Sequence, residues 1–412
     1  MIEIESPVLA VEGGPRAIPY DPPKAPRWNG EEKEFLGEMV QQSSLFYWNG
    51  PQTQRLLSRF REVYPFEHVM PCSSGTAAIH IALATAQIGW GDEVITSPIT
   101  DMGSVIGILY QQAVPVFADI DPQTYNMSAA SVEACITERT KAIVAIHLSG
   151  NPCELGELRA LADRHGLILI EDCAQAWCAR WQGTPVGLIG DFGCYSLNDF
   201  KHISSGDGGI VATNNPKYGP LLQKYGDKGY SRDGGARMPE ILGLNYRISE
   251  PQSAVAAAQM ARVEEITRNQ NEMGTLLTSL LEGLPGLILH HIAPGNYSTF
   301  WFYILRLMPE QFTCTRDEFA AAVAAEGFQC GPGYIRVPLY RYPVFQNHNF
   351  SPKGWPVRDQ GATTVDYRKV HCPEAEAMLK ECITMPLPLG GDMDYIRDGA
   401  VAIRKVFHRY RR

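Results

Sequence analysis

The sequence predicts an α/β protein with a mostly parallel central sheet and a smaller second domain toward the C-terminus. From Glu67 onward, short β-rich runs alternate with helix-like segments of about ten to fifteen residues, a pattern typical of a parallel sheet with helical crossovers. After Glu250, alanines at helical spacing begin a long connecting helix that ends at about Leu284. A different mixture of strand-like and helix-like segments follows, which indicates a second domain.

The first elements belong to an arm and a large domain. Residues 1–25 are rich in proline and lack sustained periodicity, so we expect an extended arm that is a candidate contact to another subunit. Residues 26–260 form the large domain, which begins with a helix at about Glu31–Gln42 and contains a clear amphipathic helix at Glu154–His165. The expected strands are His68–Pro71, Glu93–Thr96, Val114–Phe117, Ala142–His147 and Leu167–Ile170.

The remaining elements, in residues 261–412, are the rest of the connecting helix and the small domain. A strand-like stretch at Thr299–Leu307 precedes a helix that Thr315 caps and that continues through Ala325. A segment rich in proline, glycine and tyrosine then leads to a final amphipathic helix.

The composition excludes several classes of protein. The 412 residues are 45% hydrophobic and 20% charged, an ordinary globular mixture. The net charge of −9 has the wrong sign for a protein whose main partner is nucleic acid. No apolar stretch approaches the ~18 residues of a membrane span, and the first residues lack a signal-peptide pattern. The ten cysteines form no close CxxC pair, so we expect free thiols in the reducing cytoplasm.

The first feature that points to chemistry is the turn Met70–Thr76, which passes from a strand into a helix. Such a helix start offers free backbone N–H groups and a favourable dipole for an anion, and the hydroxyls of Ser74 and Thr76 can add donors. Taken alone, this turn favours a simple helix cap over an anion site.

Two further features follow along the chain. The apolar strand Leu167–Ile170 ends in Glu171-Asp172, which brings a carboxylate to the edge of the sheet where open α/β folds bind ligands. Lys201 then lies between a strand and a glycine-rich turn, among apolar and small residues that favour an enclosed amine. A phosphate site, an acid at a strand end and an enclosed lysine are the three groups that pyridoxal 5′-phosphate (PLP) chemistry requires.

The segments that carry these features resemble a known family. SSGTAAIHIAL, GDEVITSP, PVFADID, EDCAQAW, SLNDFKHISSGDGG and GLNYRISEPQ are similar to motifs of the PLP-dependent sugar aminotransferases of fold type I, often called the DegT/StrS family. The resemblance covers about residues 26–410. It implies a central sheet with helices on both faces, a smaller C-terminal α+β domain, and a homodimer with shared active sites.

The resemblance also implies roles for individual residues. Lys201 is expected to form the Schiff base with PLP and Asp172 to hold the pyridine nitrogen protonated, with Gln175 near the ring hydroxyl. The expected phosphate ligands, in addition to the candidate Ser74, are Gly75, Thr76, Ser196 and, reaching into the neighbouring subunit, Asn245.

One departure from the family concerns the face of the cofactor ring. Where family members usually have a stacking aromatic residue, this chain has Asp101 in Pro98-Ile-Thr-Asp101-Met102. Either Asp101 caps the following helix, or its carboxylate faces the site and meets substrate hydroxyls or an amine. The lysine is present and followed by His202, whereas the related sugar 3-dehydratases have histidine in its place, which disfavours dehydration.

Three other residues are candidates for contacts with the substrate or the site. His147 ends a strand, where it either approaches the cofactor or only satisfies a polar edge. Arg247 follows a loop that can close over an anionic or polyhydroxyl substrate or can be an ordinary exposed loop. Tyr334 is a candidate for the entrance from the small domain, with simple packing as the alternative.

Other kinds of site lack their sequence patterns. The histidines form no HxH or HExxH motif and no tight cluster with cysteine, so we expect no metal site. Neither a dinucleotide-binding GxGxxG nor a hydrolase GxSxG is present in a suitable context.

The function we expect is transfer of an amino group to the keto group of a sugar, nucleotide-sugar or cyclitol, with pyridoxamine phosphate as the intermediate cofactor form. The expected donor is glutamate or glutamine, and the sequence does not tell them apart. The alternatives are a PLP-dependent sugar dehydratase and a PLP-binding regulatory protein without turnover.

Overall fold

A computed structural model describes residues 7–24, 26–28, 30–232, 234 and 238–412. Its central sheet has seven strands, and the predicted α/β architecture with a mostly parallel sheet is confirmed. Strand β9 runs antiparallel to both of its neighbours, β1 and β8, whereas the other adjacent pairs are parallel. In spatial order the strands are β1 (His68–Cys72), β9 (Gly209–Thr213), β8 (Phe192–Ser196), β5 (Ile168–Asp172), β4 (Thr140–Ile146), β2 (Glu93–Thr96) and β3 (Val114–Phe117).

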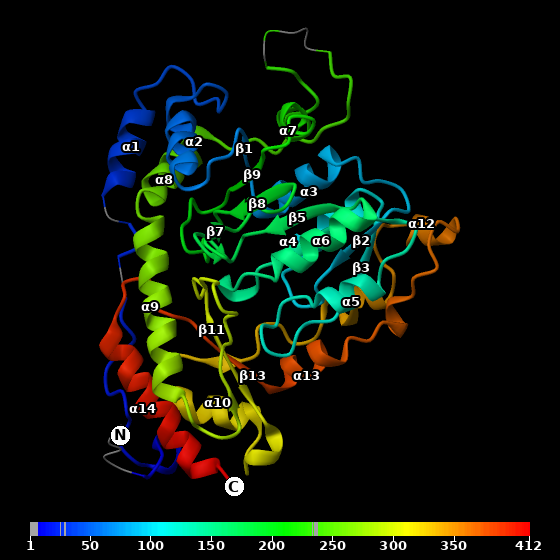
Figure 1. Ribbon diagram of the computed structural model, residues 1–412. Helices are drawn as coiled ribbons and strands as arrows, with labels where there is room; N and C mark the ends of the chain where they lie inside the picture. The colour runs from blue at the N-terminus through cyan, green and yellow to red at the C-terminus, as the bar shows by residue number, and fades with distance from the viewer. Residues whose placement is uncertain (1–6, 25, 29, 233, 235–237) are drawn as a thin grey trace.

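Helices of the large domain surround this sheet (Figure 1). Helix α3 packs over β8 and β9, whereas α6 packs against β5. The helices of this part of the chain are α1 (Glu31–Met39), α2 (Pro51–Val63), α3 (Gly75–Thr85), α4 (Gly103–Tyr110), α5 (Ala129–Ala134), α6 (Leu155–His165), α7 (Gly219–Gly226) and α8 (Glu250–Met260). A small two-stranded sheet, β6 (Arg180–Trp181) and β7 (Thr184–Pro185), follows β5 in the chain.

The second domain is built on a four-stranded antiparallel sheet. Its strands, in spatial order, are β10 (Leu287–Ile288), β11 (Tyr303–Leu307), β13 (Cys382–Met385) and β12 (Gly331–Pro332). The helices from here on are α9 (Val263–Leu281), α10 (Arg316–Ala325), α11 (Pro343–Gln346), α12 (Pro356–Asp359), α13 (Pro373–Glu381) and α14 (Met393–Tyr410). Thr315 caps α10 as expected, because its hydroxyl accepts from the N–H of Glu318, whose carboxylate in turn accepts from the N–H of Thr315.

The connecting helix differs from the prediction because it is broken. Helix α8 ends at Met260, and Arg262 leaves the helical region with φ −115° and ψ 1° before α9 begins. The guanidinium of Arg262 donates to the carbonyl of Arg27 and to the Glu32 carboxylate, which ties the break to the start of the large domain. Helix α9 then runs down to the second sheet with α14 beside it (Figure 1).

The N-terminal arm contacts the second domain of its own chain over the residues that the structure describes. Leu9 and Ile18 are buried in the core of that domain. The N–H groups of Ala10 and Ala17 donate to the buried carboxylate of Glu326, which also pairs with Lys405 at 2.9 Å. The arm therefore fastens to α10 and α14, and residues 1–6 and 25 of the expected arm lie outside the described residues.

The second half of the chain also contributes to the first domain. Tyr340, Phe345 and Tyr367 pack around Phe117 at the end of β3. They come from the range 261–412 but belong to the core of the large domain. The division into 1–25, 26–260 and 261–412 stays a prediction, and part of the range 261–412 packs in the core of the large domain.

Among the described residues, no helix combines the length and the apolar character that crossing a membrane requires.

Candidate active site

A cavity of about 520 Å³ lies at the carboxyl edge of the central sheet, where β5 and β8 end. This volume is in the usual range for a small-molecule or cofactor site. Nine of the predicted site residues line it: Ser74, Gly75, Thr76, Asp101, Asp172, Gln175, Ser196, Lys201 and Tyr334. The fold thus brings together residues that are far apart in the sequence, from Ser74 to Tyr334.

The start of α3 forms one wall of the cavity. Ser74 is the N-cap, and its hydroxyl oxygen accepts from the N–H of Ala77 at 3.0 Å, which leaves the hydroxyl hydrogen free to donate. The first N–H groups of a helix have no acceptor within it, so those of Gly75 and Thr76 can bind an anion. A Cβ on Gly75 would lie 2.7 Å from the Cβ of Ser196, so only glycine lets α3 approach β8 this closely. This tight corner suits the phosphate of PLP.

Asp172 is the last residue of β5 and is almost fully buried. Burial raises the pKa of its carboxyl, and hydrogen bonds from the Ser104 hydroxyl at 2.7 Å and the Ala174 N–H at 3.0 Å oppose that rise. These two bonds fix the orientation of the carboxyl at the cavity wall. A carboxyl in this position can hold a proton at the ring nitrogen of a heterocycle.

Lys201 lies in the turn between β8 and β9 and faces the same cavity as Asp172. Its Nζ atom is 3.7 Å from the centre of the Trp301 ring. Burial lowers the pKa of the amine to about 8, although the charges of Asp172 and Asp101 act in the opposite direction. Because the pKa is so low, a substantial fraction of the amine is neutral near physiological pH and can act as a nucleophile or a base.

Gln175 and Tyr334 connect the two domains at the site. The Gln175 side chain accepts from the N–H of Ser149 at 2.8 Å and donates to the Tyr334 hydroxyl at 3.2 Å. The Tyr334 ring stacks on Phe302, with ring centres 5.1 Å apart. Tyr334 therefore forms part of the cavity wall on the side of the second domain.

Asp101 both supports the start of a helix and lines the cavity. Its carboxylate accepts from the N–H of Gly103 at 2.8 Å, at the start of α4, and the residue also lines the cavity and is exposed. The carboxylate thus supports the helix start with one oxygen while it faces the space that a substrate would enter.

Three predicted residues do not line this cavity. His147 is fully buried: its Nδ1 accepts from the N–H of Cys153 at 3.1 Å, so Nε2 carries the proton and donates to Glu171 at 3.0 Å. Arg247 pairs with buried Asp227 at 3.1 Å. Asn245 is exposed, pairs with Asp227 in an isolated β-bridge and does not line the cavity of its own subunit.

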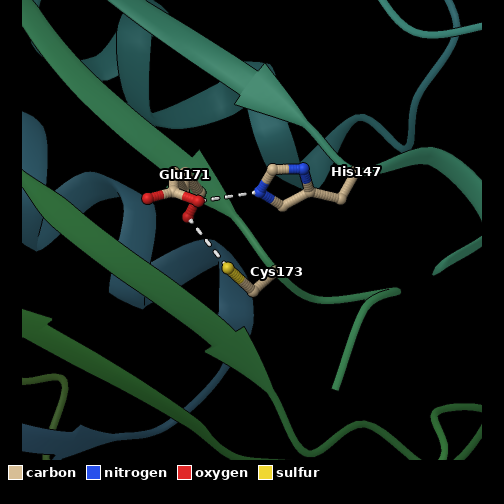
Figure 2. Close-up of side chains that lie close together, drawn as sticks. All are labelled: His147, Glu171 and Cys173. Atoms are coloured by element: carbon tan, nitrogen blue, oxygen red, sulfur yellow. Dashed lines mark hydrogen bonds and ion pairs between the residues drawn. The ribbon is translucent and has the colours of Figure 1, made fainter. Parts of the chain in front are cut away.

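Figure 2 shows the one group of potential metal ligands found among the described residues: His147, Glu171 and Cys173. Hydrogen bonds already account for both ring nitrogens of His147, and the Glu171 carboxylate also accepts from the N–H groups of Gly187, Ile189 and Gly190. Burial raises the pKa of the Cys173 thiol well above its usual range. These bonds hold the loop at 187–190 against β5, and the expectation of no metal site stays a prediction.

The sequence did not single out Trp301 and Ser104. Trp301 falls in the stretch predicted as a strand, but Phe300 has a φ of +40°, so residues 298–302 bend out of β11. The N–H of Trp301 donates to the carbonyl of Ser149, which places the indole beside Lys201. Ser104 is an ordinary helix residue in the sequence, and only the fold brings it to Asp172.

Comparison with known proteins identifies the family of the chain. Residues 29–394 match the model of the DegT/DnrJ/EryC1/StrS aminotransferase family, so the chain belongs to this family. It is a PLP-dependent aminotransferase of fold type I, as the sequence predicted.

Individual relatives cover most of the chain. An L-glutamine:2-deoxy-scyllo-inosose aminotransferase of Streptoalloteichus tenebrarius is 33% identical over 359 residues, which are 83% of each chain. A GDP-perosamine synthase of Caulobacter vibrioides is 32% identical over 78% of this chain and 85% of its own. The solved structure of an aminotransferase from Psychrobacter cryohalolentis superposes with a TM-score of 0.83, at 25% identity, over 94% of this chain and 99% of that one.

Proposed function

We propose that this aminotransferase moves an amino group from glutamate or glutamine to the keto group of a sugar, nucleotide-sugar or cyclitol. The observation that carries the proposal is that Lys201, Asp172 and the start of α3 line one cavity at the carboxyl edge of the sheet. The names of two relatives, one acting on a keto cyclitol and one making an amino sugar nucleotide, support this range of substrates.

The residues that line the cavity have separate proposed roles. Ser74, Gly75, Thr76 and Ser196 hold the phosphate of the cofactor, and Asp172 keeps a proton at its ring nitrogen. When bound, PLP supplies an electron sink and carries the amino group between donor and ketone as pyridoxamine phosphate. Lys201 anchors the cofactor through its amine, and its Nζ, with a pKa of about 8, can take a proton from the substrate carbon and give it back.

The chain is also proposed to act as a homodimer with shared active sites. Contiguous exposed apolar surface marks interaction sites, and Tyr110, which is 74% exposed, and Leu242, which is 93% exposed, border one hollow of about 210 Å³. Exposed Asn245 lies a few residues from Leu242, so it belongs to the same proposed contact face. The free thiols of all ten cysteines, each in the described part of the chain, support a cytoplasmic location.

The test is a half-reaction in the absence of ketone. The PLP-loaded protein should show the visible absorbance band of lysine-bound PLP, and glutamate or glutamine should bleach it as the amino group is transferred. Separate titrations with the two amino acids identify the donor. Lys201→Ala should fold normally and lack the band, and a Lys201→Ala variant with full activity would contradict the proposal.

The alternatives give different outcomes in the same experiment. A dehydratase would convert a deoxy sugar without stoichiometric consumption of an amino donor, and the retained Lys201 argues against it. A regulatory protein would bind PLP and leave the band unchanged with every donor and ketone.

A further inference from the structure

Asp101 places a negative charge on the substrate side of the cavity. The charge acts on Lys201, whose pKa it raises, and on the hydroxyls of Tyr334 and Tyr342, whose pKa values it also raises. Asp101, Lys201 and Tyr334 all line the cavity, the first two from the large domain and Tyr334 from the second half of the chain. Asp101 therefore faces the same space as the lysine and Tyr334.

The carboxylate retains most of its binding capacity. An ionised carboxylate offers about four acceptor positions, and the hydrogen bond recorded for Asp101 uses one, from the N–H of Gly103. Within the described residues Asp101 forms no salt bridge. Lys201 is the only cationic side chain among the described residues that line the cavity, against the three carboxylates of Asp101, Asp172 and Asp207.

We propose that Asp101 determines substrate specificity by accepting hydrogen bonds from hydroxyl or ammonium groups on the ring of the keto substrate and of its amine product. The same charge disfavours rings that carry a carboxylate or phosphate close to the reacting carbon. This inference rests on the proposed function, because it assigns a substrate class to the same site. Hydrogen bonds to an ionised acceptor are short and strong, whereas like charges brought together are destabilising.

The helix-capping role of Asp101 can be separated from this role. Asparagine caps a helix start about as well as aspartate, so Asp101→Asn keeps the bond to Gly103 and removes only the charge. Asp101→Ser keeps a capping oxygen in a shorter side chain and serves as the second variant if the first one folds poorly. Asp163→Asn is the matched control, because Asp163 is an exposed residue on α6, away from the cavity.

The experiment measures single-turnover bleaching of the PLP-loaded protein by ring amines, which is the reverse of ketone amination. The probes are scyllo-inosamine with one amine, streptamine with two, and an amino uronic acid that carries a carboxylate. For Asp101→Asn we expect the concentration of streptamine at half-maximal rate to rise by at least about tenfold. We expect a smaller rise for scyllo-inosamine, since asparagine still accepts from hydroxyls, and weaker discrimination against the amino uronic acid.

Two readouts show whether the effect is specific. The half-reaction of Asp101→Asn with the amino-acid donor shows whether a loss is confined to the ring amines, and Asp163→Asn should match the unmodified protein with all probes. A rise for streptamine alone assigns Asp101 to an ammonium, and equal rises for both aminocyclitols assign it to hydroxyls. Unchanged values for all three ring amines, or an equal loss with the amino-acid donor, would overturn the inference. If the unmodified protein responds to neither amino acids nor ring amines, the proposed function fails and the inference falls with it.

Discussion

At the scale of single residues, the environment of Lys201 decides what the site can do. An ordinary lysine has a pKa of about 10.4 and is almost entirely protonated at neutral pH. Here the enclosed position beside Trp301 lowers the pKa to about 8, in spite of the attraction from Asp172 and Asp101. The amine can therefore lose its proton under physiological conditions without a separate base.

This environment predicts the pH dependence of PLP capture by the cofactor-free protein. Only the neutral amine attacks the aldehyde, so the rate should rise with pH through a midpoint near 8 and then level off. Stopped-flow absorbance at constant ionic strength measures the rate, with Nα-acetyl-lysine as the reference whose rate rises toward about pH 10.4. A midpoint above about pH 10 would show that Lys201 is open to solvent.

Two variants of Trp301 refine this prediction. Trp301→Ala admits water, and because burial is the largest influence on the lysine pKa, the midpoint should move upward. Trp301→Phe keeps the enclosure and should leave the midpoint near that of the unmodified protein.

At the scale of elements, the sequence predicts regular segments better than their interruptions. The strands at Glu93–Thr96 and Val114–Phe117 match β2 and β3 residue for residue, because each is a short β-rich run between turn signals. The break between α8 and α9 carries no such signal, since Ala261 and Arg262 are good helix formers. Tertiary contacts of Arg262 with Arg27 and Glu32 stabilise the break, and such contacts are invisible in a single sequence.

Another element-level feature that the sequence does not show is the cap on α2. Buried Glu250, at the start of α8, accepts from the N–H groups of Gln52 and Thr53 and from the Thr53 hydroxyl. Gly50 has no room for a Cβ, which would lie 2.2 Å from the Glu250 carboxylate. A residue distant in sequence thus satisfies the first donors of a helix.

We therefore expect Glu250→Ala to lower the free energy of unfolding by about 1–3 kcal/mol, because the buried N–H groups of Gln52 and Thr53 lose their acceptor. Denaturant unfolding followed by circular dichroism measures the change, and Glu272→Ala, at an exposed position of α9, is the control. PLP binding should survive under native conditions. A change equal to that of the control would show that water replaces the carboxylate.

At the scale of the whole molecule, most of the candidate site followed from the sequence. Nine of the residues singled out from the sequence motifs line one cavity. They meet there because the carboxyl ends of parallel strands lie at one edge of the sheet. Trp301 was missed because Phe300 has a positive φ that its residue type does not suggest, and the strand begins only at Tyr303. The position of Asn245 relative to the cavity depends on a second copy, which one chain does not contain.

The proposed sharing of active sites predicts the behaviour of mixed dimers. Lys201→Ala removes the anchoring amine, and Asn245→Asp places a negative charge where the neighbour's phosphate is expected. Each homodimer should be inactive or weak. In a hybrid one site carries both defects and the other carries neither, so random reassociation should restore up to about a quarter of the unmodified activity.

Activity after denaturation and joint refolding, compared with the two variants refolded separately and then combined, measures this recovery. Absence of recovery, with hybrid formation verified by mass spectrometry, would place Asn245 in its own subunit's machinery or in none.

Two neighbouring acids at the end of β5, Glu171 and Asp172, have different roles. Successive side chains of a strand point to opposite faces, so Glu171 holds the loop at 187–190 while Asp172 reaches the cavity. Deleting one residue within Ile168–Ile170 would exchange the two faces, leaving the loop unsupported and presenting the longer acid to the cofactor. Both side chains would lose their partners together, so the length of this strand matters as much as its two acids.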